Sequence, residues 1–181
     1  MHDFGGTIGL PYAIKYPEKV TKMVLFNTWL WATKQDEGAL KVDKILHSGM
    51  GKFLYLNLNF SPRFLLKKAF YNAKKLSKTV HQHYRKPFPN KASRYGLLKI
   101  GQALVGSSDW YESQWQQIDR IKDKPILLLW GTKDEFIKEA YLEKWKSTLT
   151  NATVKTYEAG HFVQEEAFEE SCAEIARFLK V

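Results

Sequence analysis

Three polar residues, each within a short turn sequence, could carry out one reaction together. Asp3 lies in the sequence His-Asp-Phe-Gly-Gly, Asp134 follows Gly-Thr-Lys, and His161 follows Ala-Gly. An aspartate can act as a nucleophile, a histidine can activate water as a general base, and a second carboxylate can orient that histidine. Each residue alone also fits a simpler interpretation, because aspartate is a common helix cap and turn residue and a loop histidine can pack on a helix.

The segments before two of these residues are expected to be strands. Residues 125–130 are an apolar run, typical of a buried parallel strand, and they directly precede the turn with Asp134. Residues 152–157 alternate between polar and apolar side chains and precede the turn with His161. A third strand is expected over residues 23–26. Parallel strands would bring these turns to one edge of a sheet.

Helical patterns separate the expected strands. Helices are expected over residues 4–15, 139–148 and about 165–179. The last of these should bury one face, which consists of Phe168, Cys172, Ile175 and Leu179.

The long middle segment shows helical patterns and no strand signal. One amphipathic helix is expected to include Phe64, Leu65, Lys68 and Tyr71. The alternation of strand and helix at both ends predicts an α/β fold with a parallel sheet, interrupted by a helical insertion. The expected division is residues 1–32 as the first part of the core, 33–114 as a helical lid, and 115–181 as the second part.

The three turn residues follow the order nucleophile, acid, base that is typical of α/β-hydrolases. Asp134 lies 131 residues after Asp3, which leaves room for a helical lid, and His161 lies 27 residues after Asp134. The sequence HDFGGTIGLPYA resembles the nucleophile turn of haloalkane dehalogenases and the related epoxide hydrolases. The sequences VLFNTWLW, LLLWGTKDEF and YEAGHFVQEEAFEE resemble the strand before their lid, their acid-bearing strand and their histidine loop.

The resemblance implies hydrolytic displacement at a saturated carbon, without metal or cofactor. Asp3 would attack the carbon to form an ester, and His161, held by Asp134, would activate the water that hydrolyses it. The Phe4 backbone N–H would supply half of the oxyanion hole. The expected substrate is a small apolar organic molecule.

The sequence departs from the dehalogenase pattern directly after the nucleophile. The family usually has a tryptophan there, whose indole N–H holds the departing halide, whereas this chain has Phe4. Another donor is therefore expected, and the candidates are Trp29, Trp31 and Trp110. An epoxide hydrolase is the alternative enzyme, in which a lid tyrosine (Tyr55, Tyr71 or Tyr84) would protonate the opening oxygen.

Met1 lies only two residues before Asp3, whereas the family has several strands before its nucleophile. The chain is therefore expected to be the C-terminal portion of such a hydrolase and to show little turnover alone. A catalytically inactive fragment or interaction module is the remaining alternative.

Charge and composition narrow the class of partner. The net charge of +9 comes from residues 63–99, which hold 11 lysines and arginines and no acidic residue. This local excess argues against a nucleic-acid binder, and a solvated lid surface is favoured over membrane contact. No metal site is expected, since His81 and His83 share no helix face. The single cysteine, Cys172, and the lack of a signal peptide or apolar span suggest a cytoplasmic protein, of open oligomeric state.

Overall fold

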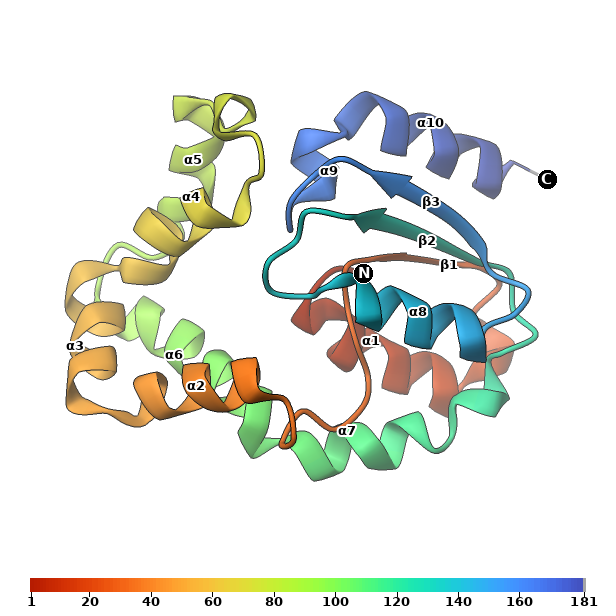
Figure 1. Ribbon diagram of the computed structural model, residues 1–181, viewed down its shortest axis with the longest axis horizontal. Coiled ribbons are helices and arrows are strands. Elements are labelled where there is room, and N and C mark those ends of the chain that lie inside the picture. The colour runs from red at the N-terminus through yellow and green to blue at the C-terminus, as the bar shows by residue number, and fades with distance from the viewer. Residues whose placement is uncertain (181) are drawn as a thin grey trace.

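The computed structural model describes residues 1–180, and its centre is a parallel three-stranded sheet in the order β1-β2-β3 (Figure 1). Leu25 of β1 pairs with Leu128 of β2, which in turn pairs with Val154 of β3. The strands are β1 (Met23–Phe26), β2 (Ile126–Gly131) and β3 (Thr153–Tyr157). The expected α/β fold with a parallel sheet is confirmed.

Helices cover both faces of the sheet and form a separate group beside it. They are α1 (Phe4–Lys15), α2 (Glu37–His47), α3 (Gly49–Leu58), α4 (Leu66–Ala69), α5 (Lys78–Arg85), α6 (Lys91–Gly106), α7 (Ser108–Trp115), α8 (Glu139–Thr148), α9 (Val163–Glu166) and α10 (Phe168–Leu179). Short 3₁₀ turns lie at η1 (Pro17–Lys19), η3 (Ala73–Lys75) and η4 (Ile118–Arg120), and a π-helical turn, η2 (Ser61–Leu65), precedes α4. No helix within residues 1–180 is long and apolar enough to cross a membrane.

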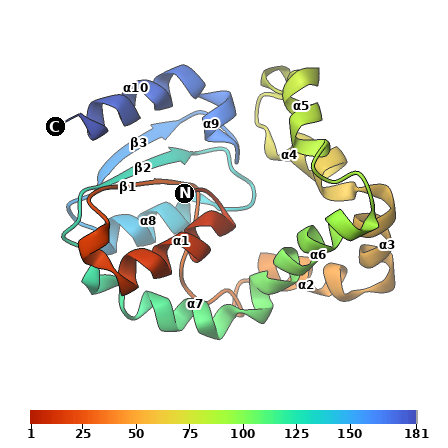
Figure 2. The ribbon, with the colours of Figure 1, turned by 180° about the vertical axis from the view of Figure 1, so that it is seen from behind.

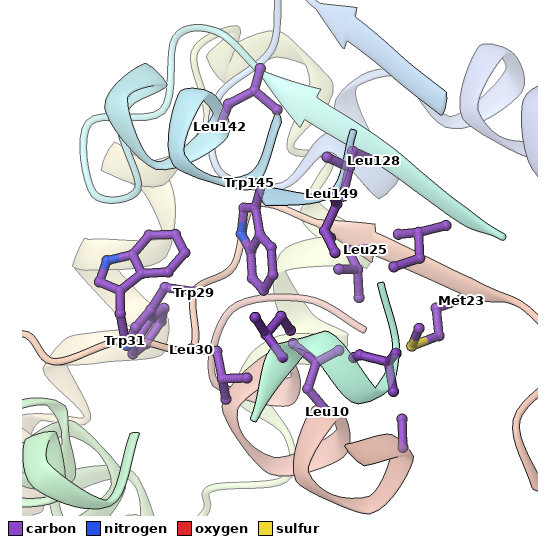
Figure 3. Close-up of a cluster of buried hydrophobic side chains, with 14 of the residues drawn as sticks. Leu10, Met23, Leu25, Trp29, Leu30, Trp31, Leu128, Leu142, Trp145 and Leu149 are labelled. Atoms are coloured by element: carbon purple, nitrogen blue, oxygen red, sulfur yellow. The ribbon is translucent and has the colours of Figure 1, made fainter. Parts of the chain in front are cut away.

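The larger core lies between the sheet and helices α1 and α8 (Figure 3). All six residues of β2 are buried, as expected for the middle strand of a parallel sheet. Leu10 of α1 and Trp145 of α8 are fully buried against it. On the opposite face a smaller cluster forms around Ala159, Val163 and Ala167.

Helices α2 to α7 connect β1 to β2. Figure 1 and Figure 2 show that α2 to α6 lie beyond the carboxyl ends of the strands and that α7 returns along α1. Helix α6 packs against α2 and α3, and its start is fixed by a capping box between Asn90 and Ser93. The boundaries at residues 33 and 114 stay a prediction.

Two expected helices differ in the structure. The helix expected to reach Tyr71 ends at Ala69, because the backbone of residues 70–72 is drawn into contact with the histidine loop. The final helix is broken at Ala167 into α9 and α10. Its expected buried face was wrong, since α9 supplies the interior contact and the side chains left exposed are Phe168, Cys172 and Leu179.

Candidate active site

Asp3 occupies a sharp turn between an extended segment and helix α1. The Met1 carbonyl accepts a hydrogen bond from the Phe26 N–H (2.8 Å), and the Asp3 N–H donates to the Asn27 carbonyl (2.9 Å), so this segment lies beside the end of β1. The Asp3 backbone has φ 50° and ψ −131°, a conformation that costs an L-residue roughly 1–3 kcal/mol. The turn leaves the Asp3 side chain partly exposed at the carboxyl end of the sheet.

Close packing between α1 and the residues after β1 keeps this turn in place. The Thr28 hydroxyl donates to the Asp3 carbonyl at 2.6 Å. A Cβ atom at Gly6 would collide with the Thr28 side chain. Glycine at position 6 is therefore required for the helix to approach this closely.

Asp134 is buried, and its carboxylate accepts four hydrogen bonds. Oδ2 accepts from His161 Nδ1 (2.8 Å) and from the Asn27 side-chain amide (2.9 Å). Oδ1 accepts from the N–H groups of Phe136 (2.8 Å) and Ile137 (3.1 Å). Sequence reasoning missed Asn27, which is fully buried and also bonds both backbone groups of Gly131. The acid is thus fixed from two sides.

His161 lies between the two aspartates. Its Nδ1 is bonded to Asp134, and its Nε2 lies 3.7 Å from Asp3 Oδ2. Burial acts to lower the pKa of His161, but hydrogen bonds and charges from Asp134 and then Asp3 outweigh it and raise the pKa to about 9. The imidazole therefore has one nitrogen bonded to Asp134 and the other directed at the candidate nucleophile.

His2 is a second histidine at the site that sequence reasoning did not identify. Its Nε2 lies 2.8 Å from the His161 carbonyl, and the two rings are 4.4 Å apart. Burial, together with the nearby His161, lowers the pKa of His2 to about 4. His2 is therefore neutral at pH 7 and can donate its Nε2–H to that carbonyl.

Asp3 and His161 open into a cavity of about 710 Å³ that extends between the sheet and helices α2 to α6 of the expected lid. Its walls include apolar side chains of α2, α3 and α6, such as Ile45, Leu54 and Leu97. Such a volume is within the range of small-molecule sites and suits an apolar ligand.

Only one of the three candidate tryptophans contributes to this cavity. Trp29 lines it, packs edge-on against Phe4 at 4.9 Å, and has an indole N–H without a hydrogen-bond partner within residues 1–180. Trp31 instead packs in the core against Trp115 of α7 and against Tyr141 and Trp145 of α8, and it is not part of the cavity lining. Trp110 is exposed on α7. The structure therefore does not bring Trp31 or Trp110 to the site.

The lid tyrosines are also distinguished by position. Tyr55 and Tyr84 line the cavity, whereas Tyr71 is exposed. The Tyr84 hydroxyl donates to Glu165 at 2.8 Å, and burial followed by this carboxylate raises the pKa of Tyr84. The histidine His81, for which no metal site was expected, lies with its Nε2 2.8 Å from the Pro62 carbonyl.

The chain resembles known enzymes over most of its length. It is 26% identical to a cis-3-alkyl-4-alkyloxetan-2-one decarboxylase of Shewanella oneidensis over 99% of this chain, and 28% identical to haloalkane dehalogenase 2 of Mycobacterium tuberculosis over 91%. The chain spans 58% of the length of each of these relatives.

Solved structures share the fold. The haloalkane dehalogenase DatA of Agrobacterium tumefaciens superposes with a TM-score of 0.79 at 22% identity, over 98% of this chain and 65% of DatA. A tetrameric haloalkane dehalogenase, DpaA of Paraglaciecola agarilytica, gives 0.79 at 21% identity, over 99% of this chain and 60% of DpaA. The family model for the alpha/beta hydrolase fold matches residues 2–168. The chain therefore belongs to the α/β-hydrolase fold family and is similar to haloalkane dehalogenases.

Proposed function

We propose that the protein displaces a leaving group from a saturated carbon through a covalent ester on Asp3, in the manner of a haloalkane dehalogenase. One observation carries the proposal. His161 joins the two aspartates, with Nδ1 2.8 Å from Asp134 and Nε2 3.7 Å from Asp3, at the end of a largely apolar cavity. This arrangement supports the roles of nucleophile for Asp3, base for His161 and orienting acid for Asp134.

A carboxylate nucleophile selects the type of electrophile. Attack on an acyl carbon would produce a reactive anhydride, whereas attack on a saturated carbon produces a stable ester. In the first step an Asp3 oxygen forms a bond to the carbon, the carbon–halogen bond breaks, and the halide leaves with the electron pair. The Trp29 indole N–H, which has no partner among residues 1–180, supplies the hydrogen bond that the Phe4 side chain cannot offer.

In the second step water hydrolyses the ester. His161 Nε2 takes a proton from the water as its oxygen attacks the carbonyl carbon of the esterified Asp3. The tetrahedral oxyanion lies at the start of α1, where no hydrogen bond from the Phe4 N–H is found within residues 1–180. Phe4 can therefore donate to it. On collapse the bond to the alkyl oxygen breaks, and this oxygen takes the proton back from His161 and leaves as the alcohol. The carboxyl group of Asp3 then loses its remaining proton to water, which restores the carboxylate.

A second candidate is decarboxylation of an oxetan-2-one, the reaction named for the Shewanella relative. This reaction is favoured by the Phe4 side chain, which has no N–H group with which to bind a departing halide. In the decarboxylation no halide departs, because the leaving group is a carboxylate that stays attached to the substrate. Asp3 would attack the ring carbon and break its bond to the ring oxygen. Loss of CO₂ would then leave electrons that form the alkene double bond and expel Asp3. This route consumes no water. The epoxide alternative is less favoured, since the raised pKa of Tyr84 makes it a weaker acid.

The test traps the proposed ester in the protein. His161→Gln should accumulate an alkyl adduct on the peptide that contains Asp3 after exposure to a 1-bromoalkane, detected by mass spectrometry. Asp3→Ala should abolish both adduct and bromide release. The second candidate predicts CO₂ and alkene from a dialkyl oxetan-2-one instead. An adduct on another residue, or turnover by Asp3→Ala, contradicts the proposal.

A further inference from the structure

Glu166 is a buried carboxylate that lies outside the proposed reaction. It is 7% exposed, and none of the ion pairs found within residues 1–180 includes it. A buried charge without a cation is costly unless several donors surround it. The structure supplies three such donors, all of them backbone N–H groups.

These three donors come from two segments that are far apart in the sequence. Glu166 Oε1 accepts from the N–H groups of Gly160 (2.8 Å) and Tyr71 (3.1 Å), and Oε2 accepts from the Asn72 N–H (2.7 Å). Gly160 directly precedes His161, whereas Tyr71 and Asn72 follow lid helix α4. The carboxylate thus binds the lid to the loop that holds the base.

A further backbone contact joins the same two segments, residues 69–72 and the loop with Gly160 and His161, which together form the junction. The His161 N–H donates to the Ala69 carbonyl at the end of α4 (2.8 Å), and Figure 1 shows α4 opposite α9 at this edge of the sheet. A Cβ atom at Gly160 would collide with the Ala69 carbonyl and would come within 2.6 Å of the Tyr71 nitrogen. The lid and the histidine loop therefore meet through backbone atoms.

We propose that Glu166 is a positioning residue, which sets the place of the His161 imidazole by joining its loop to the lid edge at residues 69–72. The inference rests on the proposed function, because it assigns Glu166 to the step that needs the base. Asp3 belongs to a different turn, and within residues 1–180 it forms no hydrogen bond with Glu166, Gly160 or residues 69–72. Disturbing Glu166 should therefore impair ester hydrolysis while leaving ester formation intact.

Glu166→Gln is the selective perturbation. The amide oxygen can replace only one carboxylate oxygen, so at least one backbone N–H would face the NH₂ group. Glu165→Gln is the matched control, because Glu165 is adjacent and also contacts the lid, through the Tyr84 hydroxyl, but does not bond Gly160. The Tyr84 hydroxyl can still donate to the glutamine oxygen.

The measurement is rapid-mixing kinetics with a 1-bromoalkane. In Glu166→Gln we expect an unchanged rate of the first bromide burst, a steady-state rate lower by about tenfold or more, and accumulation of the Asp3 ester. The steady-state rate should also follow pH with a shifted midpoint. Glu165→Gln should behave as the wild type. Because the burst amplitude counts folded active sites, partial unfolding lowers the amplitude and leaves the burst rate unchanged.

Gly160→Ala provides a second route to the same junction, since it forces the two segments apart without removing a charge. It should give the same kinetic pattern. A proportional loss of both steps in Glu166→Gln and Gly160→Ala, or no loss in either, would overturn the role of Glu166. If His161→Gln itself accumulates no ester, the proposed function fails instead.

Discussion

Replacing Asp3 by asparagine should lower the pKa of His161 by a measurable amount. Asp3 Oδ2 lies 3.7 Å from His161 Nε2, and the side chain of Asp3 is 38% exposed. Unit charges at about 4 Å interact by about 1 kcal/mol in bulk water and about 4 kcal/mol near a protein surface. Since about 1.36 kcal/mol corresponds to one pKa unit, the pKa of His161 should fall from about 9 by about 1 to 3 in Asp3→Asn.

The assay is an NMR titration of the His161 ring in the wild type and in Asp3→Asn. Glu158→Gln is a suitable control, because among residues 1–180 the Glu158 side chain bonds only the exposed Tyr71 hydroxyl, so this change should leave the titration unchanged. An unchanged pKa of His161 in Asp3→Asn would refute the electrostatic coupling between these residues.

The effect of the Asp3 charge on the pKa of His161 would also set the order of ester formation and ester hydrolysis. A base with a pKa of about 9 is protonated at pH 7, and a protonated imidazole cannot activate water. In the proposed mechanism, esterification would remove the charge of Asp3, just as asparagine does, and so would lower the pKa of His161. The base thus becomes available when the ester has formed, and ester hydrolysis should accelerate as pH rises through the lowered pKa.

Three further predictions concern the Trp29 indole N–H, the close contact at Gly6 and the buried imidazole of His2. Trp29→Phe should slow ester formation from a bromoalkane by about 10²-fold in single-turnover assays. Trp31 lies outside the cavity, so Trp31→Phe should leave that rate near the wild type. Gly6→Ala should lower the free energy of unfolding by about 1–3 kcal/mol in urea titrations, while Gly5→Ala, whose added Cβ meets nothing within 4 Å, should not. Because the folded pKa of His2 is lowered to about 4, its stabilising contribution is present above pH 6.5 and lost as pH falls toward 4. His2→Gln should therefore lose less stability between pH 7 and pH 4.5 than the wild type.

The sequence was sufficient to predict the strands and to group three turn residues. Apolar runs of four to six residues marked β1 and β2, and parallel strands leave the residues that follow them at one edge of the sheet. Asp134 and His161 follow β2 and β3, and Asp3 precedes α1, so their proximity could be inferred from order and spacing. Their roles remain a proposal.

The contacts that hold these residues could not be inferred in the same way. Asn27 and Glu166 bind backbone groups of distant turns, and no periodicity or motif reports such bonds. The choice of Trp29 over Trp31 also depends on tertiary packing, since the two residues are separated by one position in the sequence but only Trp29 lines the cavity. One signal was available: glycine at position 160, directly before the histidine, indicated a close backbone approach.

The most direct test of the central claim is one turnover of a bromoalkane in ¹⁸O-labelled water with enzyme in excess. If Asp3 is the nucleophile, the alcohol carries unlabelled oxygen from its carboxylate, and the label appears in the peptide that contains Asp3. Direct attack of water on the substrate would instead place the label in the alcohol and leave Asp3 unlabelled, which would contradict the proposed mechanism.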